Sequence, residues 1–155
     1  MPDESQKNAR ALPRNQVLIA LPRSMELVAA VYRETKCWPR DEQYGLISQI
    51  RRAAVAIPSN LAEGHGRSGP REFAHHTSIA YGSLCEVETQ LLIAQELGYV
   101  GKEAMPQIFD LIADVRRLCR GLLRTLNDRS VSPSPPSPPS PPEAKPTPPE
   151  RSDAP

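Results

Sequence analysis

The most constraining feature of the sequence is a stripe of apolar and small residues between residues 73 and 98. It alternates steps of four and three without a break: Phe73, Thr77, Ala80, Leu84, Val87, Leu91, Ala94 and Gly98. This average repeat of 3.5 residues puts the side chains on one face of an α-helix and is typical of helices in a left-handed bundle. Gly69 or Ser68 can cap the helix, and Pro70 suits its first turn. We therefore expect a long helix from Pro70 to Gly98, with a neighbouring helix packed closely against the glycine at position 82.

A second stripe precedes it and predicts a helix that starts after residue 41 and ends near residue 66. Its members are Ile47, Ile50, Ala54, Ile57 and Leu61. Asp41 is the expected N-cap, with Glu42 in the first turn, where the helix dipole favours negative charge. Pro58 should kink the helix because it lacks an N–H group and clashes with the carbonyl of residue 54. Gly64 and Gly66 are expected to end the helix in a left-handed turn.

Two further helices complete the expected fold. The first should run from Arg23 to Lys36, with Pro22 at its start, and the last from Glu103 to Asn127. In the first helix the expected inward face is Met25, Val28, Tyr32 and Thr35, with Leu27 and Val31 beside it. The last helix has an expected seam at Ile108, Leu111, Val115, Leu118 and Leu122, widened by Ile112, Cys119, Leu123 and Leu126. Residues 14–21 are open to two interpretations, a helical turn that docks on the bundle or a frayed arm.

The composition divides the chain into three parts. Residues 1–13 are polar and predict a disordered arm, and residues 14–129 predict an all-α, antiparallel up-down four-helix bundle. Residues 130–155 contain 11 of the 18 prolines and almost no apolar side chains. Such a segment cannot bury enough surface to offset the entropy of ordering, so it predicts a disordered polyproline-II tail. The tail is interpreted as a spacer or as a docking segment for an aromatic groove in a partner.

Charge and motifs restrict the function. The net charge is only +1, from 19 basic and 18 acidic side chains, so any nucleic-acid binding must come from local patches. Three cysteines without paired spacing argue against a disulfide framework, and no signal peptide or membrane span is visible, so a soluble cytoplasmic protein is expected. Cys85 and Cys119 are interpreted as small core residues. No catalytic motif is present, and Glu72, His75 and His76 do not complete a metal site. We expect no enzyme, no cofactor and no metal.

Arginines are the strongest candidates for a binding site. One group surrounds the second helix and its exit, at Arg51, Arg52, Arg67 and Arg71, and the other lies on the last helix, at Arg116, Arg117, Arg120 and Arg124. The planar guanidinium group binds phosphate in a bidentate manner, so these side chains are predicted to contact an RNA or DNA backbone. The alternative is that they pair with acids of the third helix: Glu72, Glu86, Glu88 and Glu96.

Two blocks of sequence resemble a known family. The segments YGLISQIRRAAVAIPSNLAEG at residues 44–64, followed by Gly66-Arg67, and SIAYGSLCEVETQLLIAQELGYV at residues 78–100 are similar to the bacterial proteins encoded in intervening sequences of 23S rRNA genes. Accessory proteins of diversity-generating retroelements look related. The resemblance covers Arg23 to Leu126. It implies an up-down bundle, a ring-shaped homopentamer, and nucleic-acid binding without catalysis.

Two functional hypotheses follow. The first is a non-catalytic, self-assembling protein that binds an RNA or DNA backbone, since the apolar stripes are wider than a lone bundle needs. The second is a protein-interaction or scaffold module, for example an accessory to a reverse transcriptase, with no nucleic-acid affinity of its own.

Overall fold

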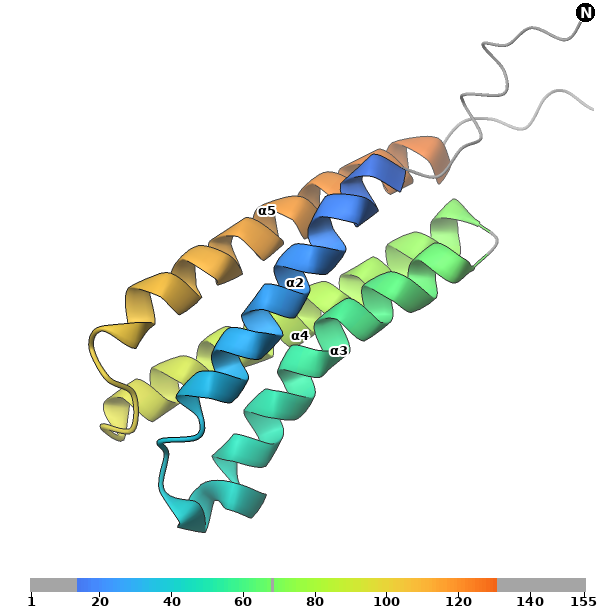
Figure 1. The fold of residues 1–155 in the computed structure, drawn as a ribbon. Helices are drawn as coiled ribbons and strands as arrows, with labels where there is room; N and C mark the ends of the chain where they lie inside the picture. Colours follow the sequence, from blue (N-terminus) through green and yellow to red (C-terminus); the bar gives the residue numbers. More distant parts are fainter. Residues whose placement is uncertain (1–13, 68, 131–155) are drawn as a thin grey trace, which may run out of the picture.

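The computed structural model describes residues 14–67 and 69–130. Over these residues the chain contains four long α-helices, one short 3-10 helix and no β-strand: α2 (Arg14–Glu34), η1 (Arg40–Tyr44), α3 (Leu46–Gly66), α4 (Pro70–Glu96) and α5 (Ala104–Ser130). Each long helix runs back along the one before it (Figure 1). The all-α class predicted from the sequence is thus confirmed for this part of the chain. The predicted arm at 1–13, residues 131–155 of the predicted tail and the candidate cap Ser68 lie outside the described residues. Ser130, predicted as the first residue of the tail, is instead the last residue of α5.

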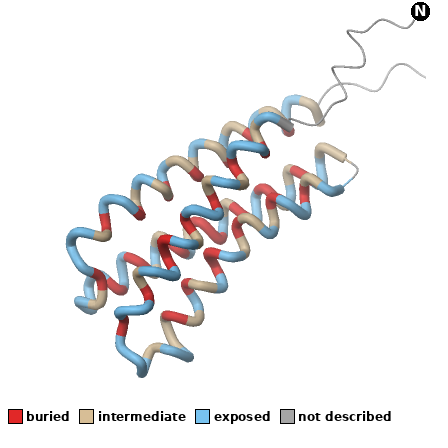
Figure 2. The backbone as a smooth tube through the Cα atoms, in the orientation of Figure 1, coloured by how far each residue is buried: buried red, intermediate tan, exposed pale blue. Residues whose placement is uncertain are grey.

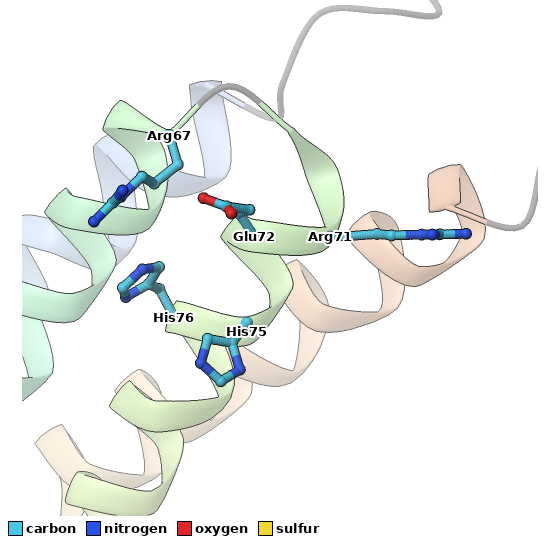
Figure 3. Close-up of a pocket in the computed structure, with 5 residues that line it drawn as sticks. All are labelled: Arg67, Arg71, Glu72, His75 and His76. Carbon is cyan, nitrogen blue, oxygen red and sulfur yellow. The ribbon is translucent and has the colours of Figure 1, made fainter.

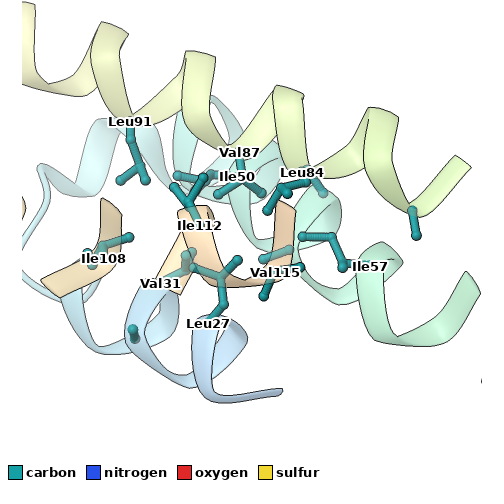
Figure 4. Packing of buried hydrophobic residues seen from close by; sticks show 14 of the residues in the cluster. Leu27, Val31, Ile50, Ile57, Leu84, Val87, Leu91, Ile108, Ile112 and Val115 are labelled. Atoms are coloured by element: carbon teal, nitrogen blue, oxygen red, sulfur yellow. The ribbon is translucent and has the colours of Figure 1, made fainter. Parts of the chain in front are cut away.

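The four long helices occupy the corners of the bundle. α2 and α4 each pack against both α3 and α5, whereas the backbones of α2 and α4 do not approach one another, and so these two helices stand at diagonal corners. Buried positions form a stripe along each helix that faces its neighbours, while exposed positions face outward (Figure 2). Side chains of all four helices meet in one aliphatic core, shown in Figure 4 by Leu27, Ile50, Leu84 and Ile112 among others.

The predicted seam of α4 is confirmed over seven of its eight positions. The seven seam residues from Phe73 to Ala94 are all completely buried. Gly98, the eighth position, lies beyond the end of the helix. It has φ +73°, a left-handed conformation that glycine adopts without a steric penalty, and it turns the chain toward α5.

The start of α2 was predicted wrongly. The helix begins at Arg14 rather than Arg23, and Pro22 lies inside it. An interior proline removes one helical hydrogen bond, but the turn before it is held by tertiary contacts. Val17 and Ala20 are buried in the core, and Gln16 Nε2 donates a hydrogen bond to Thr125 Oγ1 of α5 at 3.3 Å. Residues 14–21 are therefore helix docked on the bundle, not a frayed arm.

The buried face of α2 also differs from the prediction. It consists of Val17, Ala20, Ser24, Leu27 and Val31, continued by Ala30 and Thr35. Met25 and Tyr32, which were expected to face inward, are exposed. The buried hydroxyl of Ser24 is satisfied by donating to the carbonyl of Leu21 at 2.7 Å, so a serine is accommodated in the core face.

The cap predicted for the second helix was wrong as well. Asp41 lies in η1, and α3 starts only at Leu46. Glu42 takes the capping role, because its Oε2 accepts a hydrogen bond from the Leu46 backbone N–H at 2.9 Å. Its Oε1 accepts one from the Tyr99 hydroxyl at 3.3 Å. We call this arrangement the Glu42 clamp; it joins the α2–α3 connection to the α4–α5 connection at one end of the bundle.

Glycines play different roles from those expected. Gly64 is helical, not left-handed, and a Cβ atom added to it would lie 2.7 Å from His76 Cβ and 2.8 Å from a ring carbon of Phe73. The close helix approach expected at Gly82 therefore occurs at Gly64, between α3 and α4. A Cβ atom on Gly82 would meet no heavy atom within 4 Å. α3 itself continues without a break through Pro58.

The seam of α5 is shifted from the prediction by part of a turn. Its buried positions are Met105, Ile108, Ile112, Val115, Cys119, Leu122 and Leu126, while Leu111 and Leu118 are half-buried. Burial raises the pKa of the Cys119 thiol to about 11. Cys85 is only half-buried, Cys37 is exposed, and all three cysteines are unpaired. None of the described helices combines the length and apolarity that crossing a membrane requires.

Candidate nucleic-acid interface

Four of the predicted arginines lie together on the outer face of α5. Arg116, Arg117, Arg120 and Arg124 line one open hollow of about 340 Å³. Steps of three and four residues on a helix bring side chains to the same face, one turn apart. Ala113 and Gly121 complete the lining, and their small size leaves room between the long arginine side chains. The structure thus gathers the predicted α5 group into one surface, which we call the α5 hollow.

Two of these four cations are paired with acids. Arg116 forms an ion pair with Glu88 of α4, and both side chains are half-buried. The Arg116 Nε atom is buried and has no hydrogen-bond partner. Arg117 binds Asp114 at 2.7 Å, and Asp114 also accepts a hydrogen bond from Arg23 of α2 at 2.8 Å. The part of the hollow near Arg116 and Arg117 is therefore partly neutralised and tied to both neighbouring helices.

Arg120 and Arg124 differ from their neighbours. Both are exposed, and neither forms an ion pair or a side-chain hydrogen bond with another described residue. Their guanidinium groups keep all their donors for an external ligand. In the α5 hollow these two side chains are best placed to bind a phosphate group bidentately.

A second hollow of about 330 Å³ lies where α3 passes into α4, lined by Arg67, Arg71, Glu72, His75 and His76 (Figure 3). Its two arginines are not brought together, because Arg67 points along α3 and Arg71 points away in the opposite direction (Figure 3). Arg67 forms an ion pair with Glu63 at 2.7 Å. The hydrogen bond from Arg67, and then the field of His76, hold the pKa of the Glu63 carboxyl below its ordinary value.

His76 is the least exposed group of this second hollow, with 15% of its side chain accessible. Its Nε2 lies 3.8 Å from Glu63 Oε1, and its Nδ1 lies 3.4 Å from Asn60 Oδ1. Polar side chains of α3 and α4 thus form one network here, which runs from Arg67 through Glu63 and His76 to Asn60. Within residues 14–67 and 69–130, no cluster of three or more histidine, cysteine and acidic side chains is arranged to hold a metal ion.

The remaining two predicted arginines are separate from both hollows. Arg51 Nε donates a hydrogen bond to the buried Thr35 Oγ1 at 2.8 Å, and its guanidinium carbon lies 4.8 Å from the centre of the Tyr32 ring. These contacts commit Arg51 to packing α3 against α2. Arg52 is exposed on α3 and stands apart from the α5 group.

Sequence reasoning missed an apolar surface. An exposed row on α2 contains Leu18, Pro22, Met25, Ala29 and Tyr32, again at alternating steps of four and three. The spacing was visible in the sequence, but placing the helix start at Arg23 cut the row at Pro22. The buried residues of α2 lie on the opposite side of the helix, so the row faces away from the core.

Comparison with known proteins gives a consistent result. A crystal structure at 1.70 Å from Bacteroides thetaiotaomicron VPI-5482, described as a protein with unknown function from the S23 ribosomal protein family, superposes with a TM-score of 0.65. The match covers 70% of this chain and 98% of that chain at 17% identity, so it shows a shared fold. No curated protein matches the chain. The family described as 23S rRNA-intervening sequence protein matches residues 16–121, which is more than half of the sequence. The chain therefore belongs to the 23S rRNA-intervening sequence protein family.

Proposed function

We propose that this protein is a non-catalytic, self-assembling helical-bundle protein that binds the phosphate backbone of RNA or DNA through the α5 hollow. The observation that carries the proposal is the convergence of four arginines in that hollow, two of them without an acidic partner. Guanidinium groups bind phosphate oxygens through paired N–H donors. The lining contains no aromatic side chain on which a base can stack, so the contact is to the backbone and does not read sequence.

Self-assembly is the second part of the proposal. With a net charge of +1, one copy offers only a local cation patch, and its affinity for a polyanion is modest. Several copies would present the same patch repeatedly to one nucleic-acid chain and bind it by avidity. The exposed apolar row on α2 supports association, and the family resemblance implies that the assembly is a ring-shaped homopentamer. Three unpaired cysteines, one of them exposed, fit a reducing cytoplasm.

The test is a binding titration of full-length protein with RNA and with double-stranded DNA over a series of salt concentrations. Arg120→Ala and Arg124→Ala should each weaken binding and reduce the slope of log K against log salt by about 0.7–0.9, the value expected for one lost phosphate contact. Arg52→Ala removes an exposed arginine from α3 and is the matched control, with an unchanged slope. Equal effects of all three variants would show that the α5 hollow is not the site.

The alternative is a protein-interaction module that serves an RNA-handling enzyme such as a reverse transcriptase, as the likeness to retroelement accessory proteins implies. The pairing of Arg116 and Arg117 with acids favours this alternative, because it removes two cations from the patch. It is supported if the wild-type protein retains no nucleic acid even at low salt.

A further inference from the structure

Two rows of exposed side chains lie on opposite sides of the bundle. The α2 seam consists of Leu18, Pro22, Met25, Ala29 and Tyr32. Leu18 has 71% and Met25 59% of its surface exposed, which is unusual for large apolar side chains repeated on one helix face. One side of the Tyr32 ring is covered by Arg51, and the rest of the seam has no cover among the described residues. A seam with this period is what a second helix packs against.

The outer face of α4 carries a matching row. The α4 seam consists of Ile79, Gly82, Glu86, Thr89 and Ile93, at alternating steps of three and four. Ile79 and Ile93 are exposed, and Gly82 opens onto free space, so an approaching helix meets no side chain there. Both seams span fifteen residues from first to last, so they have the same length along their helices.

A hollow beside the α4 seam points to an occupant. It measures about 380 Å³ and lies between the start of α3, at Leu46 and Gln49, and the part of α4 that includes Gly82, Gln90 and Ile93. The Gln90 Oε1 atom is buried beneath this surface and accepts no hydrogen bond from another described residue. Its lining includes Leu46, Gly82 and Ile93, so the hollow fits a protruding apolar side chain of a partner.

The charges beside the two seams are complementary. Arg33 in the last turn of α2 and Lys36 just beyond it are exposed, whereas Glu86 within the α4 seam and Glu96 at the end of α4 are exposed. None of these four forms an ion pair with another described residue, and the exposed Glu26 of α2 is paired with Arg23. α2 and α4 run in the same direction in the bundle (Figure 1). If two copies stand side by side with parallel bundle axes, α2 of one copy runs parallel to α4 of the next. Lys36 then comes to the same level as Glu96, and Met25 comes beside the hollow.

From these observations we infer that the α2 seam of one copy packs lengthwise on the α4 seam of the next copy. The inference rests on the self-assembly proposed above and names the surfaces that form it. Because α2 and α4 stand at diagonal corners, the contact joins two different surfaces and is heterologous. Each copy then contacts one neighbour through its α2 seam and another through its α4 seam, and assembly proceeds head to tail.

The test uses three full-length variants, with mass measured by multi-angle light scattering and folding checked by circular dichroism. Met25→Glu places an acid opposite Glu86, and Ile93→Lys places a base opposite the cations of α2. Each variant alone should fall from the wild-type mass to the mass of one chain while remaining helical. Val55→Glu introduces the same charge at an exposed apolar position of α3, outside both seams, and should keep the wild-type mass.

The decisive step is to mix Met25→Glu with Ile93→Lys in equal amounts. Each variant retains the seam that the other lacks, so the mixture should form a complex of two chains and no larger species. Suppose that the wild-type protein assembles. If the seam variants also assemble, or if their mixture stays monomeric, the α2–α4 contact is refuted while self-assembly remains. A monomeric wild-type protein would refute both, whereas loss of RNA binding alone would bear only on the α5 hollow.

Discussion

At the scale of single residues, Gly64 shows how one missing side chain sets a helix spacing. It is buried between α3 and α4, where a Cβ atom would overlap both His76 Cβ and a ring carbon of Phe73. Neither neighbour is the end of a flexible side chain, so a larger residue must push the two helices apart. Gly64 thus determines how closely α4 approaches the end of α3.

Gly64→Ala should lower the free energy of unfolding by about 1–3 kcal/mol, the usual cost of overpacking a tight contact. Gly121→Ala is the control, because that helical glycine has open space around it and alanine is the better helix former by about 0.5–1 kcal/mol. Chemical denaturation followed by circular dichroism measures both. A Gly64→Ala protein as stable as the wild type would show that the helices are not in contact there.

The Cys119 thiol makes a second residue-scale prediction. Its folded pKa is about 11, above the value of 9.0 for an exposed thiol, so between these pH values the unfolded chain releases the proton and the folded chain keeps it. The free energy of unfolding should therefore fall as pH rises from 9 to 11, by at most about 1.4 kcal/mol per pH unit. Comparison with Cys119→Val isolates this slope, since that variant has no thiol; identical slopes would contradict the burial of the group.

At the scale of helices, the ion pair between Glu88 and Arg116 connects packing to binding. The pair joins α4 to α5 and also withholds one guanidinium from the α5 hollow. Asp114 acts similarly from the other side, because it binds both Arg117 and Arg23. The number of cations available to a phosphate backbone is therefore set by the acids around α5 as much as by its arginines.

Glu88→Gln should strengthen nucleic-acid binding, because it removes a negative charge beside the hollow and frees Arg116. The salt slope should steepen by about 0.7–0.9, as for one added contact. Glu103→Gln changes the net charge equally but lies outside the α5 hollow, before the first residue of α5, and should have a smaller effect. Fluorescence anisotropy over a salt series measures both variants, and a slope unchanged in Glu88→Gln would show that Arg116 does not reach the ligand.

The helices also show what a sequence pattern can and cannot predict. The seam of α4 was predicted correctly because its period is long and regular. The start of α2 was predicted wrongly because Pro22 is a strong local signal for a helix start. The earlier turns are kept helical by the burial of Val17 and Ala20 in the core and by a contact with Thr125, which is distant in sequence. Asp41 was expected as the cap because aspartate is a common N-cap residue, whereas the hydrogen bond from Leu46 N–H to Glu42 depends on the 3-10 turn between these residues.

The candidate site was predictable to a similar degree. The spacing of Arg117, Arg120 and Arg124 already placed them on one face of a helix. Arg51 contacts Thr35 and Tyr32, and Arg116 pairs with Glu88. These contacts depend on which helices are neighbours, so they became visible only in the folded chain.

At the scale of the whole molecule, the corner positions of the helices separate assembly from binding. An assembly that uses the outer faces of α2 and α4 leaves the outer faces of α3 and α5 uncovered, because these two helices hold the other diagonal. The α5 hollows of successive copies would then lie on one side of the assembly. One nucleic-acid chain can contact several of them at once, which is the geometry that avidity requires.

The Glu42 clamp has a consequence for how the bundle comes apart. It fastens two connections together at one end, while the described residues at the other end include the α3–α4 turn, the first residue of α2 and the last residue of α5. Fraying should begin at this second end, because α2 and α5 have free helix termini there, and helix termini open at the lowest cost. Arg120 and Arg124 lie in the half of α5 that leads to it, so a polyanion laid across them would stabilise the helix turns that open first.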